Sequence, residues 1–410
     1  MKESAKKKPL GIYLHIPFCR QKCLYCDFLS APAGEETVER YVDALCRQIA
    51  LEAEGFRDRR VRTVFLGGGT PSVLTVRQMD RVLSALFSCF GIFDDAEITA
   101  ECNPGTLDFE KLEGYRRAGI NRLSIGLQSA QDRELACLGR IHDYGTFLRN
   151  YDQARRAGFS NINVDLMSAL PGQTLERWMD TLEKTVSLGP EHISAYSLII
   201  EEGTPFFQRY GEGGAEAQTG QPPLPDEELD RRMYEETGRF LAKHGYMRYE
   251  ISNYARPGYE CRHNAGYWER TDYLGLGLGA SSLIDPMRWR VSPDLEEYLR
   301  FFGPASGAGS PDRKDVCRGA DPKAVRRDVQ RLSRRERMEE FMFLGLRLTK
   351  GISAARFREA FGRRLQDVYG PALEKLKREG LIAFSEDGER LFLTDRGIDV
   401  SNYALAEFLF

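Results

Sequence analysis

Short apolar runs alternate with longer amphipathic stretches through the first half of the chain. The apolar runs have the length and composition of buried strands, expected at residues 11–16, 61–66, 97–101, 122–127, 162–166 and 192–198. Between them apolar positions recur at helical spacing, which predicts helices at 36–54, 76–87, 108–118, 144–157 and 174–187. This alternation predicts an α/β fold with a parallel sheet. Six such units fit either a six-stranded partial βα barrel or an open doubly wound sheet.

The second half of the chain has a different pattern. A Gly-, Gln- and Pro-rich excursion at 207–225 precedes an expected helix at 226–244 and a strand-like run at 246–254. After a Gly-, Asp- and Arg-rich stretch come three expected helices and a hairpin around Asp387-Gly388. These features indicate that the βα alternation of the first half does not continue into the second half. The expected divisions are a core at 1–225, a small α+β region at 226–302, a linker at 303–332 and a winged-helix-like domain at 333–410.

Composition narrows the functional class. With 410 residues and 42% hydrophobic content, the chain is expected to form two or three domains with full cores. A net charge of −3 gives no general attraction to nucleic acid or anionic membranes. No apolar run is long enough to span a bilayer, and the basic start at 1–9 lacks the apolar core of a signal peptide. We therefore expect a cytoplasmic protein, in which the nine scattered cysteines are reduced.

Three of the cysteines form a motif directly after the first expected strand. Cys19, Cys23 and Cys26 have the spacing Cys-x-x-x-Cys-x-x-Cys. A tight loop with this spacing can bind three irons of a 4Fe–4S cluster and leave the fourth iron open to a small molecule. A zinc site would need a fourth Cys or His, and a disulfide does not suit a chain without a secretory segment. Unrelated buried cysteines are a further alternative, but the motif in this position favours the cluster.

Polar residues stand where the other strands end. Gly67-Gly-Gly-Thr-Pro71 follows the second strand, and its glycines let the backbone approach a ligand closely. Glu101 can pair with an ammonium group, and Arg140 can form a fork with a carboxylate. Gln128 can bond ribose hydroxyls, while an unpaired carboxylate at Asp165 would be costly on an apolar strand. Each residue taken alone also fits a structural role, such as a helix cap or a loop hydrogen bond.

The cysteine motif, with Tyr25 just before its last member, resembles that of the radical S-adenosylmethionine (SAM) superfamily. The longer string Tyr13-Leu-His-Ile-Pro-Phe-Cys19 resembles the oxygen-independent coproporphyrinogen III oxidase-like branch. The resemblance implies a partial (β/α)6 TIM-like barrel, with SAM chelated to the open iron and an electron from the cluster able to release a 5′-deoxyadenosyl radical. The positions that match SAM-contacting residues of the family are Tyr13, Tyr25, Gly69, Thr70, Pro71, Glu101, Gln128, Arg140 and Asp165. One departure is Met167-Ser-Ala-Leu-Pro171, where relatives usually have aromatic-Gly-Leu-Pro, so the packing under the site is expected to differ.

Further features separate members of this branch. The oxidase pattern has a fourth Cys where Phe28 stands here, and it has a long N-terminal extension, whereas eighteen residues precede Cys19. The string His263-Asn-Ala-Gly-Tyr-Trp268 is similar to the signature of the HemW heme chaperones. An imidazole beside aromatic rings can ligate heme iron, although a structural histidine hydrogen-bonded in a turn is the alternative. The resemblance implies a chaperone that binds heme, with His263 as the expected ligand, and passes it to an apo-hemoprotein.

The expected acceptor is a respiratory-chain component, which would bring transient membrane association, and SAM turnover is not assigned. Two rival functions remain. One is the coproporphyrinogen III oxidase itself. The other is a winged-helix nucleic-acid regulator that carries a cluster. The third helix of the C-terminal region mixes Lys375, Lys377 and Arg378 with acidic neighbours, which favours packing or partner docking. A nucleic-acid partner is therefore not expected.

Overall fold

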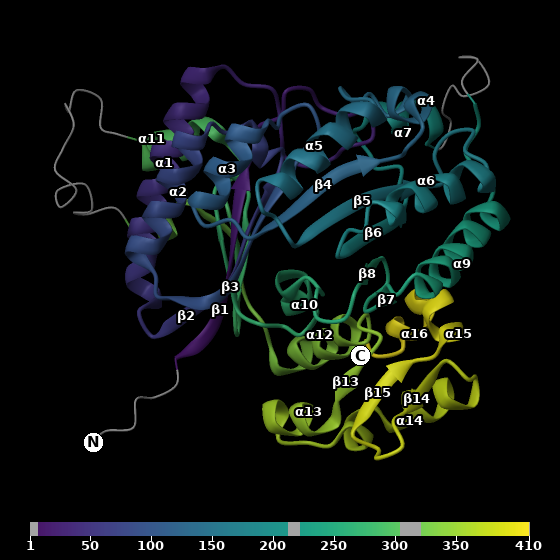
Figure 1. Ribbon diagram of the computed structural model, residues 1–410. Coiled ribbons are helices and arrows are strands. Elements are labelled where there is room, and N and C mark those ends of the chain that lie inside the picture. Colours follow the sequence, from purple (N-terminus) through teal and green to yellow (C-terminus); the bar gives the residue numbers. More distant parts are fainter. Residues whose placement is uncertain (1–6, 212–221, 304–320, 410) are drawn as a thin grey trace.

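A computed structural model describes residues 7–211, 222–303 and 321–409 (Figure 1). Its centre is a run of six parallel strands that pair in chain order. All six strands expected from the apolar runs are present, which confirms the α/β prediction. They are β1 (Lys8–Ile16), β2 (Arg59–Gly68), β3 (Ile92–Cys102), β4 (Arg122–Gln128), β5 (Ile162–Ser168) and β6 (His192–Ser197).

The expected helices connect these strands. They are α1 (Glu35–Ala53), α2 (Val76–Cys89), α3 (Phe109–Arg117), α5 (Tyr144–Arg156) and α6 (Leu175–Ser187), with an additional short α4 (Asp132–Cys137). Several begin at a residue whose side chain accepts a backbone N–H, such as Thr75 before α2 and Asp108 before α3. These caps explain why the helices start directly after polar positions in the sequence.

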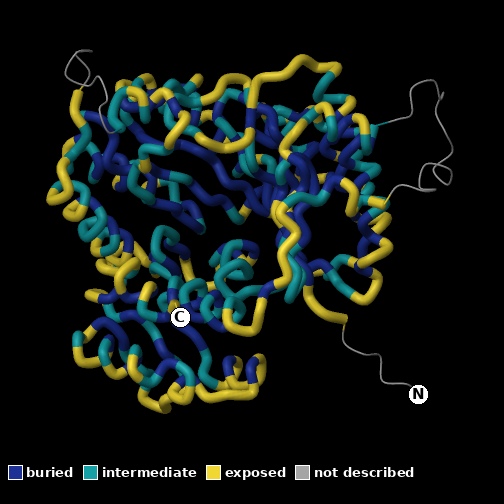
Figure 2. Tube along the Cα trace, turned by 180° about the vertical axis from the view of Figure 1, so that it is seen from behind, coloured by how far each residue is buried: buried dark blue, intermediate teal, exposed yellow. Residues whose placement is uncertain are grey.

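The two faces of the parallel sheet differ in polarity. Leu10, Ile12, Leu14 and Ile16 of β1 are fully buried in the main hydrophobic cluster. Burial of each such side chain stabilises the fold by about 1.5–3 kcal/mol. Because side chains alternate along a strand, the residues between them face the other side, inside the partial barrel. Figure 2 shows this buried sheet in dark blue beneath helices that are exposed on their outer sides.

The α+β region extends both edges of this sheet. β9 (Tyr273–Leu276) pairs parallel with β1, and β8 (Asn253–Ala255) pairs antiparallel with β6. The complete sheet has 12 strands in the order β12-β11-β10-β9-β1-β2-β3-β4-β5-β6-β8-β7. The added elements are β7 (Met247–Arg248), β10 (Ser281–Ile284), β11 (Met287–Val291), α7 (Pro205–Tyr210), α9 (Glu227–Lys243), α10 (Arg262–Trp268) and α11 (Leu295–Phe302). Short 3-10 turns lie at Glu54–Phe56 and Pro71–Val73.

Part of the stretch expected as a linker has regular structure. A 3-10 turn at Pro322–Val325 leads into β12 (Arg326–Arg331), which pairs antiparallel with β11 at the edge of the sheet. Most of β12 is exposed and it holds a single apolar residue, so its sequence has no strand-like alternation. Residues 304–320 of the expected linker and 212–221 of the expected excursion lie outside the described residues.

The C-terminal region has its own hydrophobic cluster. Its elements are α12 (Arg334–Gly345), β13 (Ile352–Ser353), α13 (Ala354–Phe361), α14 (Leu365–Arg378), β14 (Ile382–Phe384), β15 (Arg390–Leu393), α15 (Asp395–Asp399) and α16 (Ser401–Ala406). The three expected helices and the hairpin are therefore present. Tyr369 of α14 has non-helical dihedrals just before Gly370-Pro371, because proline cannot continue the helical hydrogen bonds.

Ion pairs fasten this region to the enlarged sheet. Glu340 of α12 is buried and accepts from Arg270 at 2.9 Å and from Arg288 at 2.7 Å. Asp285 accepts from Arg270 at 3.2 Å and from Arg337 at 2.5 Å. These contacts hold the C-terminal region below the amino-terminal ends of the barrel strands, as Figure 1 shows. Across the described part of the chain, no helix combines the length and hydropathy needed to cross a membrane.

Candidate functional site

The loop after β1 holds the three motif cysteines at the carboxyl ends of the parallel strands. Backbone hydrogen bonds fix this loop: the N–H of Cys19 donates to Ala31 O at 3.2 Å, and that of Cys26 donates to Cys23 O at 3.3 Å. All three thiols are free and partly exposed. Burial raises the pKa of the Cys26 thiol, and the nearby Cys23 and Cys19 thiols raise it further. A bound cation beside the Cys26 thiol would favour its thiolate form.

Two side chains donate hydrogen bonds to the cysteine sulfurs. Thr70 Oγ1 donates to Cys19 Sγ at 3.2 Å, and Arg140 Nη1 donates to Cys23 Sγ at 3.6 Å. Such donors stabilise thiolates and tune a bound cluster. Within 7–211, 222–303 and 321–409, no three His, Cys, Asp or Glu side chains are arranged to hold one metal ion together.

The glycine loop after β2 packs directly against the backbone that leads into the cysteine loop. Gly69 N donates to Ile16 O at 2.9 Å, and Thr70 N donates to Phe18 O at 2.8 Å. A Cβ at Gly69 would lie 2.7 Å from both of those carbonyl oxygens, so no side chain fits there. Gly68 has a φ of +103°, a conformation that favours glycine. The glycines therefore allow the two loops to pack closely, while their close approach to a ligand stays a prediction.

Two carboxylates lie inside the barrel below the loops. Glu101 Oε2 accepts from the N–H of Gly68 at 3.2 Å. Burial, together with the nearby Asp165, raises the pKa of Glu101 to about 8. Asp165 accepts from Ser124 Oγ at 3.0 Å and Asn163 Nδ2 at 2.7 Å, yet burial still raises its pKa. Two acids held close together in a low-dielectric interior favour a cationic ligand, since it would stabilise both charged forms.

Arg140 and Gln128 stand at the end of β4. The Arg140 guanidinium donates to Gly126 O at 2.6 Å and to Asn103 Oδ1, in addition to Cys23. Gln128 has a φ of +70°, unusual for a residue with a side chain, and its Oε1 accepts from Tyr196 OH at 3.2 Å. Strained dihedrals of this kind persist where the surrounding structure holds them, and often mark ligand sites.

The two tyrosines expected near SAM have different settings. Tyr25 is part of that loop and packs edge-on against Phe206, while burial raises its pKa. Tyr13 faces the barrel interior, where its OH donates to His15 Nδ1 at 3.0 Å. His15 Nε2 then donates to Leu29 O at 2.8 Å, since a carbonyl can only accept. His15 therefore links Tyr13 to the chain just after Cys26. The inward position of His15 follows from its alternation with Tyr13 along β1. The hydrogen bonds of His15 to Tyr13 and Leu29 were not anticipated from the sequence.

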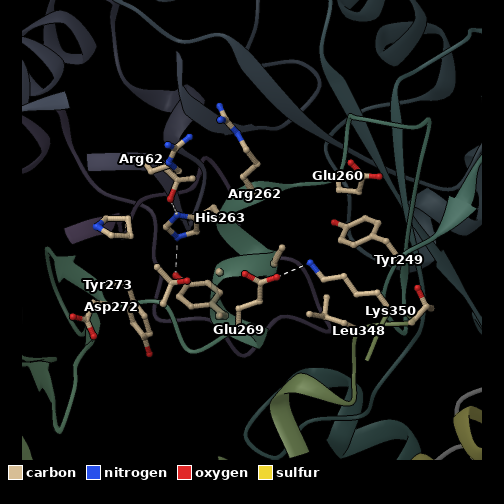
Figure 3. A pocket seen from close by; sticks show the side chains of 18 of the residues that line it. Arg62, Tyr249, Glu260, Arg262, His263, Glu269, Asp272, Tyr273, Leu348 and Lys350 are labelled. Atoms are coloured by element: carbon tan, nitrogen blue, oxygen red, sulfur yellow. Dashed lines mark hydrogen bonds and ion pairs between the residues drawn. The ribbon is translucent and has the colours of Figure 1, made fainter. Parts of the chain in front are cut away.

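His263 has a different setting from the one expected of a heme ligand. It is 3% exposed and lies on α10, below the barrel. Its Nδ1 is 2.8 Å from Thr63 Oγ1 and its Nε2 is 2.9 Å from Tyr267 OH. Dashed lines from the labelled His263 in Figure 3 mark these hydrogen bonds. Its ring stacks on Phe65, and burial lowers its pKa to about 3. Because both nitrogens have hydrogen-bond partners, this conformation offers none to iron. The geometry supports the alternative of a structural histidine.

Glu97 of β3 is a site residue that sequence reasoning did not identify. It receives the backbone N–H of Arg262 at 3.2 Å and that of His263 at 3.1 Å, so it caps α10 from inside the barrel. Cys261 Sγ donates to the same carboxylate at 3.6 Å. Cys261 is fully buried, and burial raises its pKa to about 12, which makes it unreactive. Residues 97, 99 and 101 alternate along one strand and so share its inward face, which is the sequence signal that could have identified Glu97.

A second concavity lies at the other end of the barrel from the cysteine loop. A cavity of about 920 Å³ is bounded by the amino-terminal ends of β1 and β2, by α10, and by the segment that joins α12 to α13. His263 stands in its wall, with Arg62 and Arg262 on one side and Lys350 on another (Figure 3). The barrel thus has a polar site at its carboxyl end and a separate cavity beneath it.

Comparison with known proteins agrees with this arrangement. The chain matches the profile of the radical SAM superfamily over residues 13–185 and that of the HemN C-terminal domain over 332–400. It is similar in fold to coproporphyrinogen III oxidase (HemN) from Escherichia coli, with a TM-score of 0.79, at 24% identity over 98% of this chain and 90% of that one. A likeness at this identity shows a shared fold.

Closer relatives are proteins named heme chaperone HemW. That of Lactococcus lactis is 33% identical, with 98% of both chains covered, and that of Bacillus subtilis is 34% identical over 97% of this chain and 98% of its own. The Escherichia coli protein is 41% identical over 68% of this chain and 71% of its own. Identity at this level along nearly the full length, on a radical SAM fold, means that the chain belongs to the HemW family of heme chaperones.

Proposed function

We propose that this chain binds heme and transfers it to an acceptor apo-hemoprotein in the cytoplasm. The observation that carries the proposal is 33% identity to the Lactococcus lactis heme chaperone HemW over 98% of both chains. The proposed acceptor is a respiratory-chain component, which would bring the chaperone transiently to a membrane.

The proposal includes two resident cofactors. Cys19, Cys23 and Cys26 would hold one 4Fe–4S cluster, and the donors Thr70 and Arg140 would stabilise their thiolates. SAM would bind the open iron, with Gly69, Thr70 and Pro71 beside its methionine end and with Glu101 and Asp165 offsetting its positive charge. When bound and reduced, the cluster can supply one electron to the sulfonium–carbon bond of SAM. We assign no turnover to it.

The remaining SAM contacts proposed are Tyr13, Tyr25, Gln128 and Arg140. Arg140 supports this set because its side chain bonds the cysteine loop and the end of β4 at once. A carboxylate placed there would meet a guanidinium group already held in position. Tyr25 supports it because its ring lies within the loop and beside Phe206, an apolar setting suited to an adenine.

Heme transfer is the direct test. Reconstituted protein is loaded with heme, freed of excess heme on a desalting column, and mixed with an apo-hemoprotein that is separable by size. The proposal predicts that the Soret absorbance moves to the acceptor fraction faster than heme released from bovine serum albumin. Absence of heme binding, or transfer no faster than from albumin, would contradict it.

The oxidase alternative requires decarboxylation of coproporphyrinogen III. Phe28, 63% exposed after the cysteine motif, is no substitute for a fourth cysteine. Under anaerobic conditions with SAM and a reductant, we expect no protoporphyrinogen IX from this protein, and its formation would favour the alternative.

The nucleic-acid alternative predicts DNA affinity that falls steeply with salt. We expect none near physiological salt.

A further inference from the structure

The cavity beneath the barrel is separate from the cysteine loop and has no role in the SAM site. It measures about 920 Å³, near the upper end of the roughly 300–1,000 Å³ that ligand cavities usually span. It lies between two parts of the fold, since Gly11 and Thr63 come from barrel strands while Leu348 and Thr349 come from the C-terminal region. Sites at such junctions commonly bind ligands.

The walls of this cavity are largely apolar and aromatic. Tyr249 and Tyr267 contribute rings, and Met247 and Leu348 contribute aliphatic surface. Tyr267 is held by His263 Nε2 at 2.9 Å, and its ring packs edge-on against Tyr273 at 4.6 Å between centroids. Tyr249 OH is fixed by His192 at 2.8 Å. A large flat ligand would therefore meet rings that are already held in place, so little side-chain entropy would be lost on binding.

Positive charge gathers in two pairs of cations at the cavity, and the two members of each pair contact the same carboxylate. Arg62 and Arg262 both contact Asp95, at 3.2 and 3.4 Å, although Arg262 also approaches Glu97 at 3.9 Å. Lys350 and Arg356 both contact Glu269, at 2.5 and 3.7 Å. Lys350 and Arg356 outnumber their single acid, and the two guanidinium groups of Arg62 and Arg262 have more N–H donors than these contacts use, so each pair can donate to a ligand carboxylate.

We infer that this cavity is the heme site, with one propionate at each cationic pair and the thioether of Met247 as an iron ligand. The inference rests on the proposed function, because heme is the ligand that the family name implies. An amphipathic macrocycle with two carboxylates matches an aromatic cavity with two cationic pairs. Met247 on β7 is 58% exposed although it is apolar, and a thioether is an established axial ligand of heme iron. His263 then serves to position Tyr267.

Heme titration of the full chain, followed by the Soret band, tests this site. Gly266 lines the cavity on α10, and a Cβ there meets only Thr271, at 3.6 Å, so Gly266→Leu adds volume without a backbone clash. We expect heme affinity to fall at least about tenfold. The matched control is Gly370→Leu, in a helix away from the cavity, where nothing lies within 4 Å of an added Cβ. Its heme affinity should equal that of the wild type.

Charge and ligation are tested with surface variants that leave the core intact. The double variant Lys350→Gln/Arg356→Gln should bind heme about tenfold more weakly, because it removes charge-assisted hydrogen bonds to one propionate. Arg358→Gln, two positions further along the same exposed helix, should bind as the wild type does. Met247→Leu should shift the Soret maximum.

The outcomes separate this site from the proposed function. If the wild type binds heme, and neither Gly266→Leu nor the Lys350/Arg356 variant weakens binding, the site is wrong and the chaperone function stands. An unshifted Soret maximum in Met247→Leu would overturn the ligand. If the wild type binds no heme, the proposed function fails and the site fails with it. Circular dichroism and the urea midpoint establish that each variant is folded.

Discussion

Replacing Gly69 with alanine tests how tightly the glycine loop is locked to the cysteine loop. The new Cβ would lie 2.7 Å from the carbonyl oxygens of Ile16 and Phe18 and 2.8 Å from Phe18 N. All three neighbours are backbone atoms, so they cannot rotate away as a flexible side chain would. The two loops must separate, which weakens the hydrogen bonds of 2.9 and 2.8 Å between them.

The magnitude follows from these contacts. Two backbone hydrogen bonds contribute about 1 kcal/mol each, and overpacking typically costs about 1–3 kcal/mol. Gly69→Ala should therefore lower the free energy of unfolding by about 3–5 kcal/mol. The displaced loop includes Cys19, so iron retained after anaerobic reconstitution should fall as well.

Urea denaturation followed by circular dichroism measures the first effect, and iron analysis measures the second. Gly55→Ala is the matched control, since nothing lies within 4 Å of a Cβ added there and its φ is not positive. Its stability should stay within about 0.5 kcal/mol of the wild type. If Gly69→Ala were as stable as Gly55→Ala and held as much iron, the argument from loop packing would be refuted.

Three further predictions concern buried polar groups. Burial raises the pKa of Glu101 from an ordinary 4.5 to about 8, so the folded protein holds a proton that the unfolded chain releases. The stability of the apo-protein should therefore fall as pH rises from about 4.5 to 8. Glu101→Gln should flatten that decline in urea midpoints, and an unchanged slope would contradict the assignment. Burial lowers the pKa of His263 to about 3, so the folded protein should lose stability as pH falls below about 6.5. His263→Gln should reduce that loss and leave the Soret maximum of the heme-loaded protein unchanged. A shifted maximum would instead identify His263 as the iron ligand. Glu340→Gln should leave the buried Arg270 guanidinium poorly paired and destabilise the protein by about 3–5 kcal/mol. Limited proteolysis should then cleave α12 more readily. A protease pattern like that of the wild type would contradict the role of Glu340 in holding the C-terminal region to the sheet.

The regular part of the fold was predictable because its signals are local. Apolar runs and helical periodicity located the six strands and their helices within a few residues. Strands β9 and β12 were missed because one is a short Gly-rich run and the other is an exposed, Arg-rich edge. Such strands form because a neighbouring strand offers unpaired hydrogen-bonding groups, which a local pattern does not reveal.

The candidate site likewise has some features that local sequence signals predict and others that they do not. The cysteines and the glycine loop have fixed spacings, so their positions at the strand ends followed from the sequence. The setting of His263 did not, because its partner Thr63 is 200 residues away in the chain. The lower cavity likewise arises where strands from the start of the chain meet a segment near its end. Contacts between such distant segments depend on the packed fold.

The cluster site is the feature on which the SAM assignments depend. Its most direct test is iron and acid-labile sulfide analysis of anaerobically reconstituted protein, for the wild type and for Cys19→Ala, Cys23→Ala and Cys26→Ala. We expect about four irons and four sulfides per chain in the wild type, and a large loss in each variant. A colourless wild-type protein with less than one iron per chain, or variants that keep the full complement, would contradict the assignment.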